Sequence, residues 1–347
     1  MNYILFDPPE IERFYPFTLT RPLGELRVFG GTLKELWEQH LGCKISYLTR
    51  DYLSSLYPVV LKEKNTLLNP LDIFDISNDN GIFFSYDGSQ SLDEMRLLTQ
   101  KNTAPSPINN LFDLLSRDYI GFKNKSFASN IDCSKHSLMN DDSGPIYVEE
   151  NVDIMEGAMI RGPVYIGKGS VIKMGAKIYG PTVIGPYCKI GGEVSNCIFL
   201  GYSNKAHDGF LGHSIIGEWC NIGAGSSNSN LKNDYGNVKM WNYLAKKFKD
   251  SGRQFLGLYM GDHSKCAINT SFNTGTTIGV NCNIFGTAFL RNFISSFSWG
   301  GAQGLKVYHF KKAISVAEKV MSRRGVKLTK EYIEMLRAVY DKEMEQN

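Results

Sequence analysis

The hydrophobic positions in the middle of the chain repeat every six residues. Taken in sixes from residue 146, the sequence reads IYVEEN, VDIMEG, AMIRGP, VYIGKG, SVIKMG, AKIYGP, TVIGPY and CKIGGE. The third position is aliphatic throughout: Val148, Ile154, Ile160, Ile166, Ile172, Ile178, Ile184 and Ile190. A helix repeats every 3.6 residues and a strand every two, so neither element explains this spacing. The repeat is typical of a parallel β-helix, in which inward aliphatic side chains stack from coil to coil.

The repeat breaks and then returns. After Glu193 the register slips, and the pattern reappears at Ile216 and Ile222. An insertion at about 227–257 interrupts it again, and it resumes at Met260, Cys266, Phe272, Ile278 and Ile284. We therefore predict a β-helix over 145–295. Glycine and proline fill many turn positions, as expected where corners need positive φ.

The residues before the repeat have a different pattern. A buried strand at 2–6, an amphipathic helix at 31–42 with Thr32 as its cap, and a second strand at 44–50 are predicted. This order indicates an α/β domain over 1–144. Residues 101–145 are polar and contain Pro, Asn and Ser, so we expect a connecting segment with a short helix near 108–118.

The residues after the repeat, 296–347, are predicted to be mostly helical. Two stretches within 309–345 place apolar residues at helical spacing, and Thr329 stands where it would cap the second. The aromatic segment RNFISSFSWGGAQG (291–304) is expected to pack onto the β-helix body or onto a neighbouring subunit.

Composition narrows the class of partner. The 347 residues contain 38 basic and 35 acidic side chains, a net charge of +3, so no strong field favours nucleic acid or a membrane. The N-terminus has no signal-peptide pattern and no apolar run long enough to span a bilayer, so a cytoplasmic protein is expected. The seven cysteines form no C-x-x-C pair, which argues against a disulfide framework or a zinc site.

Three motifs carry a resemblance to a known family. These are GGEVSN (191–196), SNKAHDGFLGHSIIGEWCNIGAGS (203–226) and GDHSKCAINT (261–270). With them, residues 146–290 resemble the left-handed β-helix domain of the bifunctional UDP-N-acetylglucosamine pyrophosphorylase/glucosamine-1-phosphate N-acetyltransferase, and of bacterial sugar-nucleotidyltransferase-like proteins. Residues 20–38 extend the resemblance weakly to the nucleotidyltransferase domain.

The resemblance implies a fold and an assembly. It implies a truncated or degenerate nucleotidyltransferase-like α/β domain, then a left-handed parallel β-helix of hexapeptide repeats, then C-terminal helices. It also implies a homotrimer with active sites between adjacent β-helices, and acetyl-CoA as the acyl donor.

The family's catalytic residues transfer in part. His207 lies in the family's K-A-x-H context, and Glu193 precedes it by the family's fourteen residues. The resemblance implies that His207 takes a proton from the attacking sugar amine while Glu193 orients the imidazole. It further implies that Asn221 and Lys177 contact the acceptor, and that Ser264, Ala267 and Asn269 belong to a groove for the cofactor within 261–290.

The departures from the family matter equally. Ser195 replaces a phosphate-binding lysine, Phe210 stands near the position of a tyrosine, and only Asn230 remains of a substrate-binding stretch. These changes argue against glucosamine 1-phosphate as the acceptor, or against acetyl transfer altogether. His213 and His263, at predicted coil corners, are additional candidates.

The N-terminal domain carries a weaker nucleotide-binding signal. After the first strand the chain reads DPPEIERFYPFTLTRPLGELR, without the glycine-rich loop that brings backbone amides to phosphates. Arg21 and Arg27 are candidates for contacting an anion, and Mg²⁺ would be needed only if nucleotidyl transfer is active.

Three functions therefore remain open. The first is transfer of an acyl group from acetyl-CoA to a sugar or nucleotide sugar by a β-helix trimer. The second is nucleotidyl transfer to a sugar 1-phosphate by the N-terminal domain, and the third is a non-catalytic trimer that binds a nucleotide sugar.

Overall fold

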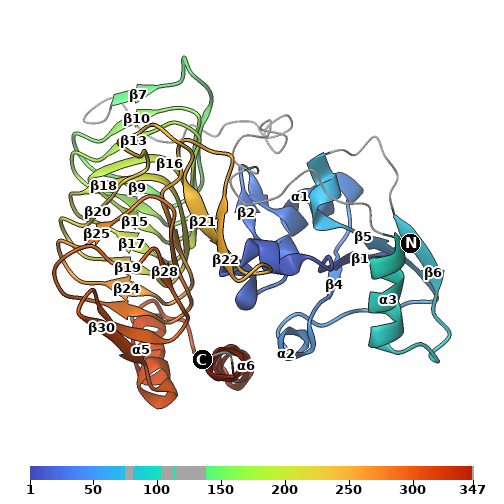
Figure 1. Cartoon of the computed structure of the whole chain (residues 1–347). Helices are drawn as coiled ribbons and strands as arrows, with labels where there is room; N and C mark the ends of the chain where they lie inside the picture. Colours follow the sequence, from blue (N-terminus) through green and yellow to red (C-terminus); the bar gives the residue numbers. More distant parts are fainter. Residues whose placement is uncertain (75–80, 103–112, 114–137, 346–347) are drawn as a thin grey trace. The chain divides into compact units, whose positions relative to one another are not determined.

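The computed structural model describes residues 1–74, 81–102, 113 and 138–345 of the chain. It divides into two compact units (Figure 1). One comprises Met1–Asn124 with Thr329–Ala338, and the other comprises Lys125–Leu328 with Val339–Asn347. Among the described residues, no helix combines the length and the apolar character that crossing a membrane would need. The expected fold class is confirmed: a nucleotidyltransferase-like α/β unit, a left-handed β-helix of about 9 coils, and C-terminal helices.

The first unit is built on a four-stranded sheet with the order β4-β1-β5-β6. Its strands are β4 (Ser46–Leu48), β1 (Asn2–Phe6), β5 (Lys64–Leu68) and β6 (Ile82–Ser85). β1 pairs in parallel with β4 and β5, whereas β6 is antiparallel to β5. The core of this unit joins Ile4, Phe6, Leu48 and Leu67 to Met95 of helix α3 (Leu92–Asn102). The mixed sheet agrees with the predicted α/β class.

Helix α1 (Leu33–Leu41) begins as the sequence predicted. The Thr32 side chain accepts a hydrogen bond from the Glu35 amide, and the Glu35 carboxylate accepts one from the Thr32 amide. This capping box satisfies two amides at the start of the helix. The helix ends at Gly42, which adopts the left-handed conformation.

Short elements complete the first unit. They are η1 (Ile11–Phe14), η2 (Phe17–Leu19), η3 (Leu23–Glu25), β2 (Arg27–Val28), β3 (Gly31–Thr32), α2 (Asp51–Ser54) and η4 (Pro70–Phe74). The short helix predicted near 108–118 lies outside the described residues, apart from Asp113.

The second unit winds three faces of parallel strands around one core (Figure 1). The first face contains β8 (Ile146–Val148), β11 (Val164–Ile166), β14 (Thr182–Ile184), β23 (Leu258–Met260), β26 (Thr276–Ile278) and β28 (Phe293–Ile294). The second contains β9 (Asp153–Ile154), β12 (Val171–Ile172), β15 (Lys189–Ile190), β17 (Asn204–Lys205), β19 (Asn221–Ile222), β24 (Lys265–Cys266), β27 (Asn283–Ile284) and β29 (Ser298–Gly301). The third contains β7 (Leu138–Asn140), β10 (Met159–Arg161), β13 (Lys177–Tyr179), β20 (Ser227–Asn228) and β25 (Ser271–Phe272).

Two long strands, β16 (Glu193–Gly201) and β18 (Phe210–Glu218), run from the third face around a corner onto the first. The coil that contains β16 is shorter than the regular coils before it. Regular coils place Val164 opposite Thr182, whereas β15 and β17 place Lys189 opposite Asn204, only fifteen residues later. The register slip seen in the sequence is therefore a shortened coil.

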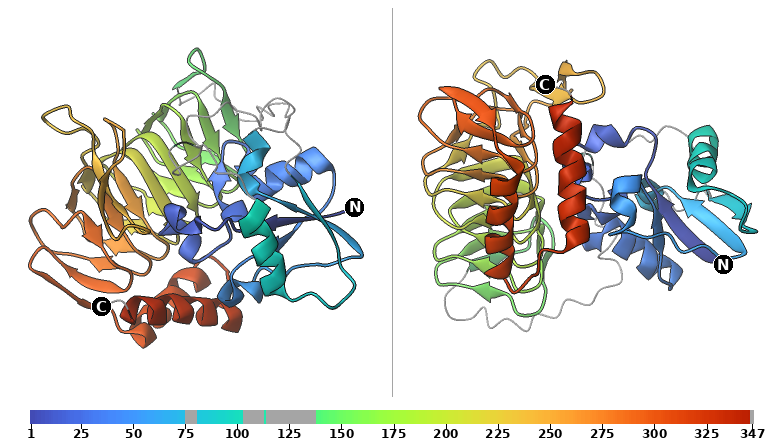
Figure 2. Two further views of the ribbon diagram at one scale, coloured as in Figure 1. Left: turned by 45° about the vertical axis from the view of Figure 1, so that its right-hand side comes forward. Right: turned by 90° about the horizontal axis from the view of Figure 1, so that it is seen from below.

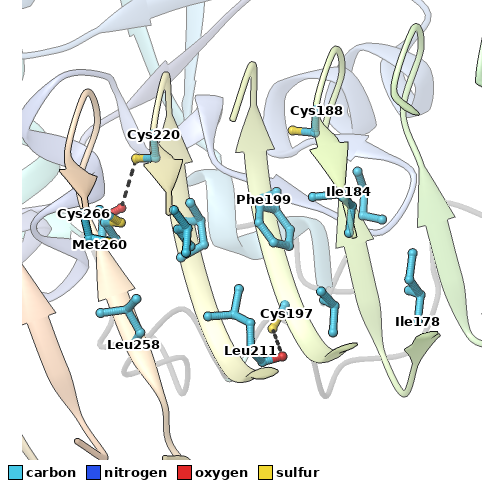
Figure 3. Packing of buried hydrophobic residues seen from close by; sticks show 14 of the residues in the cluster. Ile178, Ile184, Cys188, Cys197, Phe199, Leu211, Cys220, Leu258, Met260 and Cys266 are labelled. Atoms are coloured by element: carbon cyan, nitrogen blue, oxygen red, sulfur yellow. Dashed lines mark hydrogen bonds between the residues drawn. The ribbon is translucent and has the colours of Figure 1, made fainter. Parts of the chain in front are cut away.

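The predicted aliphatic ladder fills the interior of the β-helix. From Ile160 to Ile190, the predicted ladder residues are at most 2% exposed. Phe199, Ile216 and Ile222 continue the core beyond the slip, and Met260, Cys266, Phe272, Ile278 and Ile284 continue it beyond the insertion. Figure 3 shows Ile184, Phe199 and Leu211 directed into this interior, with the Cys197 thiol 3.4 Å from the Leu211 carbonyl oxygen. The six cysteines that the structure describes are free.

The insertion and the C-terminal segments add to the coils. The hairpin β21 (Lys239–Asn242) and β22 (Lys247–Asp250) places Trp241 in a stack on Phe293, with 4.1 Å between ring centroids. The aromatic segment 291–304 contributes β28 and β29 to the β-helix faces, and β30 (Gly304–Val307) folds back on β29.

Helix α5 (Phe310–Ser322) lies against the coils (Figure 2) and buries Ala313, Ala317 and Met321. Helix α6 (Lys330–Met344) follows Thr329, whose hydroxyl accepts a hydrogen bond from the Tyr332 amide. The predicted cap at Thr329 is thus present.

Candidate functional site

A pocket of about 480 Å³ opens at the corner between the second and third faces. Its walls come from turns of successive coils that follow β9, β12, β15, β17 and β19. The lining residues are Met155, Lys173, Met174, Gly192, Ala206, His207, Asp208, Ala224 and Gly225. Because each turn contributes a few side chains, the pocket combines thioether, cationic, imidazole and carboxylate groups within one corner.

His207 is exposed at this pocket, in the turn after β17. The backbone of this turn is bound to the coils on both sides. The Gly225 amide donates to the Asp208 carbonyl at 2.9 Å, and the Glu193 amide donates to the Gly209 carbonyl at 3.2 Å. Within the described part of the chain, the imidazole of His207 has no hydrogen-bond partner. An exposed imidazole on a fixed turn is free to exchange a proton with a bound molecule.

Glu193 lies in the coil before that of His207, at the start of β16 on the third face. It directly follows Gly192, which lines the pocket. Its carboxylate accepts a hydrogen bond from the Tyr179 hydroxyl at 2.6 Å rather than from His207. This hydrogen bond, followed by burial and the carboxylate charge, raises the pKa of Tyr179. The structure brings Glu193 and His207 to one corner of adjacent coils, but the carboxylate is engaged with a tyrosine that sequence reasoning had missed.

Lys177, Glu193 and Phe210 form one column on the third face, since each is the register partner of the next. Ser195 lies in the adjacent column opposite Tyr179, and its hydroxyl accepts a hydrogen bond from the Asn196 side chain at 2.8 Å. Three of the predicted acceptor-binding residues, Lys177, Ser195 and Phe210, therefore lie on the face beside the pocket, although none of them lines it.

Asn221 and Asn230 lie elsewhere. Asn221 is exposed on the second face, where its side-chain oxygen accepts from Asn204 at 3.4 Å. Asn230 contacts Nδ1 of His213 at 2.9 Å, at the corner between the third and first faces. Burial, with a further contribution from Arg253, lowers the pKa of His213 to about 4. His213 is therefore a neutral, partly buried residue that stacks on Phe255, at a different corner from His207.

The residues predicted for the cofactor groove lie in the turns around β24. Ser264 is fully buried, and its hydroxyl donates to the Gly279 carbonyl at 2.6 Å and accepts from the Cys282 amide at 2.9 Å. Asn269 is exposed, and its amide donates to the carbonyl of Ala224, a pocket residue. Ala267 accepts hydrogen bonds from Ser226 and Thr270. His263 is buried beside Trp219, with 6.2 Å between ring centroids.

In the first unit, the two candidate arginines differ in exposure. Arg21 is 4% exposed, and its carbonyl accepts from Arg50 at 2.8 Å. Arg27 lies 3.8 Å from the Glu35 carboxylate. Sequence reasoning missed Asp7, the residue after β1. Its carboxylate accepts from the Leu23 amide, the Thr49 hydroxyl and Arg50 at 2.8, 2.5 and 3.2 Å.

Among the residues that the structure describes, no group of three or more His, Cys, Asp or Glu side chains is arranged to hold a metal ion.

A stretch of the first unit matches a known family. Residues 3–77 match the family model described as "Sugar nucleotidyl transferase". The resemblance stated from the sequence motifs is thereby confirmed for the class of protein.

One relative combines two activities in its name, "Bifunctional sugar-1-phosphate nucleotidylyltransferase/acetyltransferase", from Sulfurisphaera tokodaii. It is 36% identical over 144 residues, which cover 41% of this chain and 35% of the relative. The match thus spans about a third of the relative's length.

Two solved structures are more distant. AntD, an N-acyltransferase from Bacillus cereus in complex with dTDP and 3-hydroxybutyryl-CoA, is 13% identical, covers 54% of this chain and 91% of its own, and has a TM-score of 0.27. A UDP-N-acetylglucosamine acyltransferase from Campylobacter jejuni is 12% identical, covers 58% and 93% respectively, and has a TM-score of 0.26.

Proposed function

We propose that the β-helix unit transfers an acyl group from acetyl-CoA to an amine or hydroxyl of a sugar or nucleotide sugar. The observation that carries the proposal is the exposed imidazole of His207 at the 480 Å³ pocket, on a turn bound to the coils on both sides. The name of the Sulfurisphaera relative, which includes acetyltransferase, supports the same reaction class.

His207 would act as the general base. As the acceptor nitrogen or oxygen attacks the thioester carbon, the imidazole takes the proton that the nucleophile loses. The new bond to carbon forms, the carbon–sulfur bond breaks, and the proton passes to the departing thiolate. A positioned base of this kind contributes about 10²- to 10⁴-fold to the rate. Glu193 would supply negative charge at the same corner, and would orient the imidazole only if it left Tyr179.

Cationic side chains near the pocket would bind the phosphates of the substrates. Lys173 lines the pocket, and Lys177 is exposed on the adjoining face. Neither has a carboxylate within salt-bridge distance among the described residues. A homotrimer with the site between neighbouring β-helices, located in the cytoplasm, belongs to the same proposal. Light scattering tests the trimer, and a monomer would contradict that part.

The test is release of CoA thiol from acetyl-CoA in the presence of a panel of amino sugars, sugar phosphates and nucleotide sugars. We expect acceptor-dependent release that falls at least about 100-fold in His207→Ala. His309→Ala is the matched control, because His309 is also exposed in this unit but lies outside the pocket. Undiminished transfer by His207→Ala would overturn the assignment.

A second candidate function, sugar-1-phosphate nucleotidyl transfer, is favoured by the family match over residues 3–77. Release of pyrophosphate from a nucleoside triphosphate and a sugar 1-phosphate with Mg²⁺ would support it. Stabilisation by a nucleotide sugar without turnover in either assay would instead favour the non-catalytic binding protein.

A further inference from the structure

A lysine occupies the interior of the β-helix next to the candidate site. On the second face, the inward positions of successive coils are Ile154, Ile172, Ile190, Lys205, Ile222, Cys266 and Ile284. Lys205 is the one charged member of this series, and it is 2% exposed. Its ammonium group donates to the Gly191 carbonyl at 3.0 Å and, over a shorter distance, to the carbonyl of His207.

Packing alone does not account for a lysine here. Isoleucine fills the equivalent position in the coil before and in the coil after, so an aliphatic side chain fits this core. A buried ammonium group is unfavourable unless its donors are bonded. The feature that distinguishes this coil is the pair of backbone carbonyls that the ammonium reaches, and one of them belongs to His207 itself.

Gly192 provides the space for this arrangement. Its φ is 66°, in the left-handed region, and a Cβ built on it would lie 2.8 Å from Lys205 Nζ and 2.8 Å from the His207 carbonyl oxygen. A residue with a side chain would therefore collide with both partners. Gly192 also lines the pocket, so the lysine, the glycine and the His207 turn form one contiguous unit.

We propose that Lys205 is a positioning residue: its buried ammonium group ties the Gly191 and His207 carbonyls together and so fixes the turn that presents His207 to the pocket. The inference deepens the proposed acyl transfer and rests on it for its catalytic consequence. The tie itself is a property of the fold, and it can be measured without any substrate.

The test compares Lys205→Met, which keeps an unbranched side chain one heavy atom shorter and removes the ammonium group, with Ile190→Met as the matched ladder control. Hydrogen exchange is followed by mass spectrometry over 206–210 and 223–226, since the Gly225 amide donates to the Asp208 carbonyl of the turn. We expect exchange in both segments to accelerate at least about tenfold in Lys205→Met only. Exchange over 158–164 should stay unchanged, because that segment lies three coils away from the 206–210 turn. Wild-type exchange in Lys205→Met would overturn the proposal.

A second measurement needs no variant, and so covers the case in which Lys205→Met does not fold. Burial lowers the pKa of Lys205 to about 8, against the opposing influence of Asp208, Cys266 and Cys197. His207 and Lys173 also lie at this corner. Opening of the turn exposes Lys205 and lets it bind a proton, so in the wild type exchange over 206–210, corrected for its intrinsic pH dependence, should gain protection between pH 8 and 9.5 while 158–164 does not. Equal behaviour of the two segments would contradict the proposal.

The catalytic consequence is measured separately. If acyl transfer is observed, Lys205→Met should lower kcat at least about tenfold with little change in the KM for acetyl-CoA, because the donor site is intact and only the base is displaced. An inactive wild type with the expected exchange behaviour would refute the proposed function and leave the positioning role standing. An active wild type matched by Lys205→Met would refute the positioning role alone.

Discussion

Lys205→Met should change how the stability of the protein depends on pH. The pKa of Lys205 is lowered from 10.5 to about 8, and burial in the β-helix core is the largest cause. Below pH 8 the lysine is protonated in both the folded and the unfolded chain. Between about pH 8 and 10.5 the unfolded chain binds more protons than the folded one, so the free energy of unfolding rises with pH. Methionine has no proton to release, and the variant lacks this rise.

The size of the effect follows from the two pKa values. The interval from 8 to 10.5, at about 1.4 kcal/mol for each pH unit, corresponds to about 3.5 kcal/mol in full, of which about 3 kcal/mol has developed by pH 10.5. We therefore expect the free energy of unfolding of the wild type, minus that of Lys205→Met, to be constant from pH 6.5 to 7.5. It should then rise by about 3 kcal/mol towards pH 10.5. Other alkaline groups, including the partly buried Lys265, are present in both proteins and cancel in the difference.

The measurement is urea unfolding at a series of pH values, with tryptophan fluorescence as the signal that reports unfolding. Three of the four tryptophans, Trp219, Trp241 and Trp299, lie in the β-helix unit. Ile190→Met serves as the control, and its difference from the wild type should not vary with pH. A flat difference for Lys205→Met across pH 8 to 10.5 would refute the inference that the ammonium is buried in the folded protein.

Three further predictions concern the same unit. In Glu193→Gln the pKa of Tyr179 should fall towards its usual value, because the hydrogen bond to Glu193 is the largest cause of its rise. The measurement is a titration of phenolate absorbance, from which the signal of Tyr179→Phe is subtracted to isolate Tyr179. An unchanged pKa of Tyr179 in Glu193→Gln would contradict that hydrogen bond. Ile190→Ala should lower the free energy of unfolding by about 2–5 kcal/mol, because it opens a cavity in the core. Met174→Ala, at a site 69% exposed, should change it by less than about 0.5 kcal/mol. Equal effects of the two variants in urea titrations would contradict the placement of Ile190 in the core. Iodoacetamide applied to the native protein should label Cys43 well before the buried cysteines, which are Cys188, Cys197, Cys220, Cys266 and Cys282. Early labelling of any of these five in peptide mass spectra would contradict their placement in the core.

The sequence predicted the β-helix well wherever coils keep a constant length. Each regular coil has eighteen residues, so a six-residue template identifies the inward positions up to Ile190 without any structure. The next coil is shorter, because β16 runs as one nine-residue strand around a corner. A template of fixed period then loses its register, which is why Lys205 was not recognised as a core residue.

The candidate site was predicted in part. His207 and Glu193 were found through the family resemblance, and the structure places them at one corner. Tyr179 precedes Glu193 by fourteen residues, and sequence reasoning missed it. Its hydrogen bond to Glu193 depends on the register between β13 and β16, which the sequence alone did not show. In the first unit, local signals gave β1 and the cap of α1, while α3 and the antiparallel β6 depend on contacts between distant segments.

Two long polar side chains inside this β-helix, those of Lys205 and Asn228, lie where the coils depart from the regular repeat. In a regular coil, each strand bonds to the coils before and after it, and aliphatic side chains with a few small hydroxyls such as Ser170 fill the interior. Where a turn leaves this pattern, its backbone groups need other partners. Lys205 bonds the carbonyls of Gly191 and His207, and Asn228 accepts from the Gly212 amide at 2.8 Å and donates to its carbonyl at 3.0 Å.

These two replacements lie in neighbouring coils, and they hold the turns that carry His207 and His213. Regular coils repeat one surface, so a distinct site needs a turn that differs from its neighbours. A turn that differs must then be secured from within. The buried lysine, which is unfavourable for stability below pH 8, is therefore explained by the position that it gives to the histidine backbone rather than by the core that it occupies.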